Sequence, residues 1–175
     1  AVFSYLIAPM VLPHIVLGMA LFRIGLFLDT SEGFALNATD SLWFYVVAHT
    51  TITIPYAIIT IGASLQTLDR NLEEAAQILG ASYFKTIFFI TIPLIKSGLI
   101  GAFIFSFIIS FDEFIVTYFL ATFNQTLPIQ IYSTLMFQLE PSIASISTLM
   151  LALTALLTLV LMSRGQLVSF AKIIK

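Results

Sequence analysis

The sequence predicts an all-α protein that crosses a membrane several times, a polytopic membrane helical bundle. Of its 175 residues, 59% are hydrophobic and 9% are charged, whereas soluble domains contain roughly 25% charged residues. The apolar residues form long continuous runs. A membrane β-barrel would instead show segments of about ten residues in which polar and apolar side chains alternate.

Four apolar runs are long enough to cross a hydrocarbon core of about 30 Å, which takes roughly 20 helical residues. These runs are residues 3–28, 42–65, 97–120 and 143–163. Pro9 and Pro13 lie in the first run and Pro55 lies in the second. Membrane helices tolerate proline because neighbouring helices satisfy the freed backbone groups. We therefore expect a kink at these prolines, with a moving hinge as the alternative.

The basic residues predict the orientation, because short loops rich in Lys and Arg stay on the cytoplasmic side. Six of the seven basic residues lie on one side: Arg70, Lys85 and Lys96 between the second and third runs, and Arg164, Lys172 and Lys175 after the fourth. The loops of the other side, 29–41 and 121–142, contain four acidic residues and neither Lys nor Arg. The segment 66–96 and the C-terminus are therefore predicted to be cytoplasmic. Arg23, near the outer end of the first run, can extend its side chain to the interface.

The polar segment 66–96 predicts two short helices joined by a sharp turn. Residues 68–79 suit an amphipathic helix, with Asp69 or Asn71 as the capping residue. Gly80 can adopt the left-handed conformation that ends a helix, so a second helix can leave at a new angle from about Ser82. The alternative is a surface loop with ordinary helix caps.

The third apolar run contains two adjacent acids, Asp112 and Glu113. A charged group at the centre of a membrane helix costs about 2.5 to 3.5 kcal/mol on insertion scales, so such groups face a cavity or a partner. In a continuous helix 97–120 they would extend a stripe of small and polar residues, namely Gly98, Ala102, Ser106, Ser110, Glu113 and Thr117. Ser110, Asp112, Glu113 and Thr117 are therefore candidates for a route taken by a cationic substrate. The alternative is a structural role, in which both acids pair with another subunit or lie at the membrane interface.

Other residue patterns exclude several kinds of chemistry. His14 and His49 each lie alone in an apolar run, without the His or carboxylate three or four positions away that a helical metal site would use, so we expect hydrogen-bonded core histidines and no metal. The sequence contains no cysteine and no phosphate-binding loop of the G-x-x-x-x-G-K-[ST] type. The net charge of −2 gives no basic surface for nucleic acid. We therefore predict neither a catalytic residue nor a bound cofactor.

The segment 66–96 carries a motif that closely resembles the EAA loop of ABC-importer permeases. In that family EAA is followed by three residues, Gly, nine residues and I-x-L-P, and this sequence has the same spacing with one exchange, Ile92 for Leu. The resemblance implies a type I ABC-importer permease fold in which residues 1–175 form one permease domain. It also implies that the four runs are the last four of six helices. The residues it assigns to coupling with an ATPase are Glu74, Ala75, Ala76, Gly80 and Pro93.

The same resemblance implies the partners of this chain. They are a second permease half, identical or homologous, two cytoplasmic ATPase subunits that bind ATP and Mg, and an extracytoplasmic solute-binding protein. The chain itself would be a multi-pass subunit of a bacterial plasma (inner) membrane, in contact with lipid and without enzymatic activity.

Two further stretches resemble the permeases of spermidine and putrescine importers. These are the S-F-D-E-F run at 110–114 and the T-L-P-I-Q-I-Y-S run at 126–133, and with the EAA loop the resemblance covers about 9–162. Polyamines are therefore the expected substrates. Permeases for ferric iron, phosphonates and opines share much of this pattern and stay alternatives. An ion-coupled transporter or channel, with Asp112 and Glu113 as the relay, is a further one.

Overall fold

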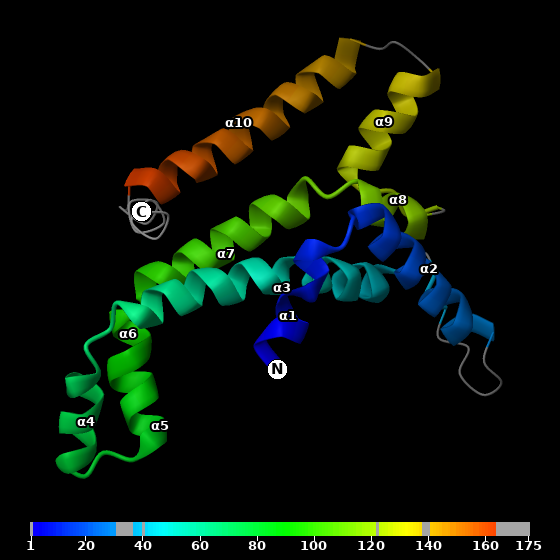
Figure 1. The fold of residues 1–175 in the computed structure, drawn as a ribbon. Helices are drawn as coiled ribbons and strands as arrows, with labels where there is room; N and C mark the ends of the chain where they lie inside the picture. The colour runs from blue at the N-terminus through cyan, green and yellow to red at the C-terminus, as the bar shows by residue number, and fades with distance from the viewer. Residues whose placement is uncertain (1, 31–36, 40, 122, 138–140, 164–175) are drawn as a thin grey trace. The chain divides into compact units, whose positions relative to one another are not determined.

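The computed structural model describes residues 2–30, 37–39, 41–121, 123–137 and 141–163, and every regular element in these ranges is a helix (Figure 1). The all-α prediction is therefore confirmed. The chain divides into two compact units, one from residues 1–55 and 107–155 and the other from residues 56–106 and 156–175. Each unit is described by itself, and the assignment of 1–175 to one permease domain stays a prediction.

The first unit begins with two helices where the sequence predicted one. α1 covers Val2–Val11 and α2 covers His14–Thr30, and the two helix axes differ by 111°. Pro13 lies in the break, and its carbonyl accepts the amides of Val16 and Leu17 at 2.9 and 3.1 Å. A proline has no amide hydrogen and clashes with the preceding turn. The sequence predicted a kink within one continuous helix over 3–28. This prediction understates the bend, because one helix ends at Val11 and a new one begins at His14.

α3 (Leu42–Gln66) agrees with the predicted run 42–65 and keeps Pro55 inside the helix. The predicted continuous helix 97–120 is wrong, because it is interrupted. α7 covers Lys96–Phe111, residues 112–114 are not helical, and α8 covers Ile115–Leu120.

Beyond α8, α9 (Leu127–Phe137) forms in a stretch that the sequence predicted to be loop. The last described helix, α10 (Pro141–Ser163), corresponds to the predicted run 143–163. By length and hydropathy, α3 and α10 can each cross a membrane. Among the described residues, four spans result if each of the two bent helix pairs also counts as one.

The core of the first unit forms where α2, α3 and α8 meet. Its buried side chains include Leu17 and Leu21 of α2, Phe44, Ala48 and Ile52 of α3, and Val116 and Leu120 of α8. α2 approaches α8 closely because Gly18 has no side chain. A Cβ atom at Gly18 would lie 2.7 Å from the ring of Phe119. Small residues allow such close packing of membrane helices.

The second unit contains the polar segment 66–96. α4 covers Arg70–Ile78 and α5 covers Tyr83–Thr86, followed by a π-helical turn, η1 (Ile87–Thr91), and α6 (Ile92–Leu94). The chain then bends by 71° into α7. In this unit Gly98 of α7 contacts α3, because a Cβ atom at Gly98 would lie 2.4 Å from the Cβ of Ser64.

Gly98→Ala should lower the free energy of unfolding by about 1 to 3 kcal/mol, the usual cost of overpacking. The new methyl group cannot avoid Ser64 by a side-chain rotation alone. Thermal unfolding of the full-length permease in detergent would measure this. Gly62→Ala is the matched control, because a Cβ atom there meets nothing within 4 Å and should stabilise the helix slightly. Adding Ser64→Gly should restore the Gly98→Ala variant, and equal unfolding temperatures for the two alanine variants would contradict the packing.

Candidate functional site

Residues 66–96 are called the EAA segment below. The first part of this segment is shaped by local interactions, a helix cap and a turn at a glycine. The side chain of Asp69 accepts the amide of Asn71 at 3.0 Å and caps α4, so Asp69 is the capping residue. Gly80 has a φ of +89°, in the left-handed region where only glycine is free of strain. The amide of Gly80 donates a hydrogen bond to the carbonyl of Gln77, and the amide of Ala81 donates one to the carbonyl of Ala76. These two bonds close the end of the helix. The predicted helix, turn and second helix are thus confirmed.

The motif residues differ in exposure. Glu74, Ala75 and Gly80 are exposed, whereas Ala76 is buried inside the segment. Pro93 is exposed in α6, directly after the π-helical turn. Three of the four predicted coupling residues that precede Pro93 can therefore contact another protein, whereas Ala76 packs inside the segment.

The EAA segment has two arms, α4 before the turn at Gly80 and the stretch from α5 to α6 after it. A hydrogen bond that the sequence did not predict joins these two arms. The hydroxyl of Thr91 in η1 donates to the carboxylate of Glu73 in α4 at 2.5 Å. Thr91 is buried, and Glu73 is partly buried. A hydrogen bond to a charged group contributes about 1.5 to 3 kcal/mol when it is not fully exposed. This bond favours movement of the two arms as one piece.

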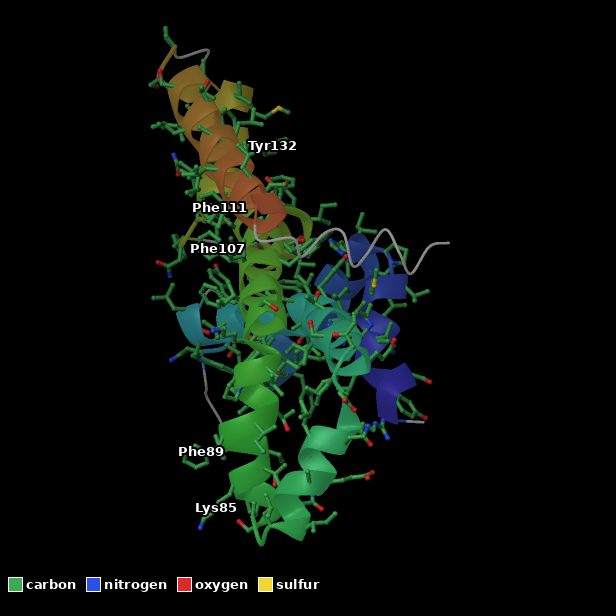
Figure 2. All side chains as sticks on the ribbon, turned by 90° about the vertical axis from the view of Figure 1, so that its left-hand side faces the viewer. Lys85, Phe89, Phe107, Phe111 and Tyr132 are labelled. Carbon is green, nitrogen blue, oxygen red and sulfur yellow. The ribbon has the colours of Figure 1, made fainter. Side chains whose placement is uncertain are left out.

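The segment exposes large apolar side chains on its outer surface. Ile78 and Leu79 at the end of α4 are 85% and 87% exposed, and the second arm exposes Tyr83, Phe84, Phe88 and Phe89. Figure 2 shows Lys85 and Phe89 pointing away from α4. Exposed apolar groups that gather in this way typically mark an interaction surface.

The break at residues 112–114 in the first unit is the second candidate site. Glu113 is buried, and one of its carboxylate oxygens lies 3.0 Å from Nδ1 of His14, the first residue of α2. The other oxygen accepts the amide of Val116 at 2.8 Å. The carboxylate therefore satisfies the start of α8, where a negative group is favourable, and pairs with α2 at the same time.

His49 of α3 contacts the helices on both sides of the break. Its Nδ1 lies 2.8 Å from the hydroxyl of Ser110 at the end of α7, and its Nε2 lies 2.9 Å from the hydroxyl of Thr117 in α8. Thr117 is completely buried. These bonds satisfy polar groups that would otherwise be costly in an apolar environment.

Asp112 lies apart from this cluster. It is exposed and lines a cavity of about 660 Å³. Among the described residues that line this cavity Asp112 alone is charged, and the others include Phe114, Tyr132, Ser147 and Thr154. The ring centroids of Phe114 and Tyr132 are 5.0 Å apart. Figure 2 labels Tyr132 together with Phe107 and Phe111, whose rings stack at 5.6 Å just before the break.

The structure thus separates the four residues predicted to form one polar stripe. Ser110 and Thr117 share His49, Glu113 pairs with His14, and Asp112 faces the cavity. The sequence identified His49 as a hydrogen-bonded core residue but did not connect either histidine to the break. A usable signal is present in the sequence: two histidines and several polar side chains in otherwise apolar runs need partners, and three of them, Ser110, Glu113 and Thr117, find these partners in the histidines.

Among the described residues, no group of three or more His, Asp or Glu side chains is placed to hold a metal ion. The predicted absence of a metal or cofactor stays a prediction.

Comparison with known proteins identifies the family. The sequence matches the family described as "Binding-protein-dependent transport system inner membrane component" over residues 1–169. The chain belongs to this family. The resemblance to ABC-importer permeases is therefore confirmed, and with it the assignment of the chain as a membrane transport component.

Three relatives of this transport family illustrate the range of substrates. The chain is 30% identical over 169 residues to the putrescine transport system permease protein PotI of Escherichia coli K12, covering 94% of this chain and 59% of PotI. It is 30% identical over 165 residues to the spermidine/putrescine permease PotC of Haemophilus influenzae, covering 94% and 60%. It is 31% identical over 131 residues to a probable molybdenum ABC transporter permease of Haloferax volcanii, covering 75% and 49%. The chain thus spans about three fifths of the length of the two polyamine permeases.

Proposed function

We propose that this chain belongs to the permease half of an ATP-driven importer that moves spermidine- and putrescine-type polyamines into the cytoplasm. The proposal is supported by the similarity to PotI and PotC, whose names state these substrates. The observation that carries it is Asp112, an exposed carboxylate and the one charged side chain among the described residues that line the cavity. Such a group attracts a cation.

The cavity has the chemistry that an alkylammonium group needs. A carboxylate forms strong, charge-assisted hydrogen bonds with an ammonium group. Aromatic faces add cation–π attraction within about 6 Å, and Phe114 and Tyr132 both line the cavity. The methylene groups between the amines of a polyamine would contact apolar lining residues such as Ile131 and Met150. Glu113 is less suited to this role, because its carboxylate already has two partners.

The EAA segment is proposed to couple the permease to the ATPase. Glu74, Ala75 and Gly80 would contact the ATPase, together with exposed apolar side chains such as Leu79 and Phe89. Ala76 and Pro93 would give the segment its shape. The Thr91 to Glu73 hydrogen bond supports transmission as a unit. ATP and Mg would be bound by the ATPase, and this chain would bind no cofactor.

The complete transporter would contain a second permease half, two cytoplasmic ATPase subunits and an extracytoplasmic solute-binding protein. The EAA segment and the C-terminus would lie in the cytoplasm, because Arg70, Lys85 and Lys96 belong to or border that segment. The surrounding lipid would be that of a bacterial plasma membrane, and no nucleic acid takes part.

The similarity to the Haloferax volcanii protein supports a second candidate, an importer of a molybdenum-containing oxyanion. The carboxylate of Asp112 in the cavity argues against it, since like charges repel. A ferric iron importer and an ion-coupled transporter or channel are further alternatives that the same experiment tests, and phosphonate and opine importers stay alternatives as well.

The test is uptake of labelled spermidine into proteoliposomes that hold the full-length permease halves, the ATPase and the binding protein. We expect saturable uptake that requires ATP, that excess putrescine inhibits, and that molybdate or ferric iron leaves unchanged. ATP-driven uptake of molybdate without uptake of spermidine would show that the substrate is the oxyanion and not a polyamine. Uptake without ATP would contradict the importer itself.

Gly80→Glu should abolish assembly with the ATPase and ATP-driven uptake while leaving membrane insertion intact. A Cβ atom at this position would meet no described atom within 4 Å, and Gly80 is exposed, so the new side chain would project from the surface proposed to dock. Gly80→Asn is the matched control, because asparagine tolerates a positive φ and is small and uncharged. Co-purification of the ATPase and the rate of uptake are the two measurements. Normal uptake by the Gly80→Glu variant would remove the coupling role.

The two adjacent acids should give different phenotypes in the same uptake assay. Asp112→Asn should raise the KM for spermidine about tenfold or more, through loss of a charge-assisted contact, with an unchanged unfolding temperature. Glu113→Gln should instead lower the free energy of unfolding by about 1 to 3 kcal/mol, because His14 loses its charged partner. Identical effects of both substitutions on KM and stability would contradict the separation of their roles.

A further inference from the structure

We propose that His14 and His49 are positioning residues that hold the break between α7 and α8, and so keep Asp112 facing the cavity. This inference rests on the proposed function, in which Asp112 contacts the substrate. It adds to that function two residues outside the motifs of the sequence.

The break contains neither of the residues that most often interrupt a helix, proline and glycine. Helix interruptions usually occur at Pro, at Gly or Ser, or where a side chain inserts into the backbone ladder. Residues 111–115 read F-D-E-F-I, without Pro or Gly. Across the break, the amide of Glu113 reaches the carbonyl of Ser110 only at 3.4 Å. Contacts from α2 and α3 therefore add to the local cap by Glu113 in holding this stretch out of the helix.

His49 supplies two of these contacts, one on each side of the break. Ser110 lies in the last turn of α7 and Thr117 lies within α8, and both hydroxyls are bonded to the same imidazole. The ring is too rigid to follow independent movements of the two helices. It therefore fixes the spacing between the last turn of α7 and the first turn of α8.

His14 supplies the third contact, inside the break. Its ring pairs with Glu113, whose second oxygen accepts the amide of Val116 at the start of α8. His14 is itself fixed at the start of α2, next to Pro13. The two interrupted helix pairs, α1 with α2 and α7 with α8, are thus joined at their breaks by the contact of His14 with Glu113.

Asp112 lies between these held residues, and its own amide donates to the carbonyl of Ile108 at 3.1 Å. With Ser110, Glu113 and Thr117 all held, the backbone at residue 112 has a fixed direction, and the carboxylate lies in the cavity. Loss of either histidine would let the break relax toward continuous helix and turn this side chain away.

Thiol labelling tests the position without using transport. The chain has no cysteine, so Asp112→Cys can be labelled with a cationic thiol reagent in the assembled transporter, after replacement of the other subunits' cysteines. We expect His14→Leu and His49→Leu each to slow labelling about tenfold, the effect of losing roughly 1.4 kcal/mol of hydrogen bonding. His14→Asn, which can donate from nearly the position of Nδ1, should keep the original rate. Unchanged or faster labelling in the leucine variants, or equal slowing by Asn and Leu, would overturn the proposal.

Uptake kinetics then link the histidines to the substrate. His14→Leu and Asp112→Asn should each raise the KM for spermidine, and the double variant should raise it no further, because both changes remove the same carboxylate contact. An additive rise would overturn a role of His14 through Asp112. If Asp112→Asn alone leaves KM unchanged, the proposed substrate contact fails, and the labelling rates still decide whether the histidines position residue 112.

Discussion

The buried carboxylate of Glu113 is the constraint on which the first unit depends. A charge within apolar helices must be paired and hydrogen-bonded, and Glu113 achieves this with His14 and with the amide of Val116. The same two contacts start α8 and join it to the start of α2. The apolar packing of Gly18 against Phe119 lies along the same pair of helices. One ionised group thus determines where a helix restarts and which neighbour it contacts.

The two candidate sites are stabilised in different ways. The EAA segment is stabilised locally, by the Asp69 cap, the left-handed Gly80 and the Thr91 to Glu73 bond, and it leaves apolar side chains exposed for a partner. The break at 112–114 is stabilised by residues distant in sequence and leaves one carboxylate exposed to a cavity. A segment that transmits force needs internal rigidity. A segment that contacts a cationic substrate needs one charge that faces the cavity.

The sequence predicted the elements whose causes are local. The helix capped by Asp69, the turn at Gly80 and the helix α3 follow from residues within a few positions of each other. The break between α7 and α8 could not be predicted, because the stretch has no helix-breaking residue and the contacts of His49 reach 61 and 68 positions along the chain. Pro13 was recognised, but the 111° bend depends on packing that a single proline does not determine. Asp112 and Glu113 lie in the apolar run that contains them in the prediction. The sequence predicts one common role for both acids, whereas the break gives each of them different surroundings.

The most direct measurement is a structure of the complete transporter, with both permease halves, the ATPase and the binding protein, trapped with spermidine in the membrane. The account predicts an amine of the substrate within about 3 Å of the Asp112 carboxylate, the distance of a charge-assisted hydrogen bond. It also predicts that Glu113 stays paired with His14 and that the EAA segment contacts the ATPase. A substrate amine bound to Glu113, with Asp112 turned away from the route, would contradict it.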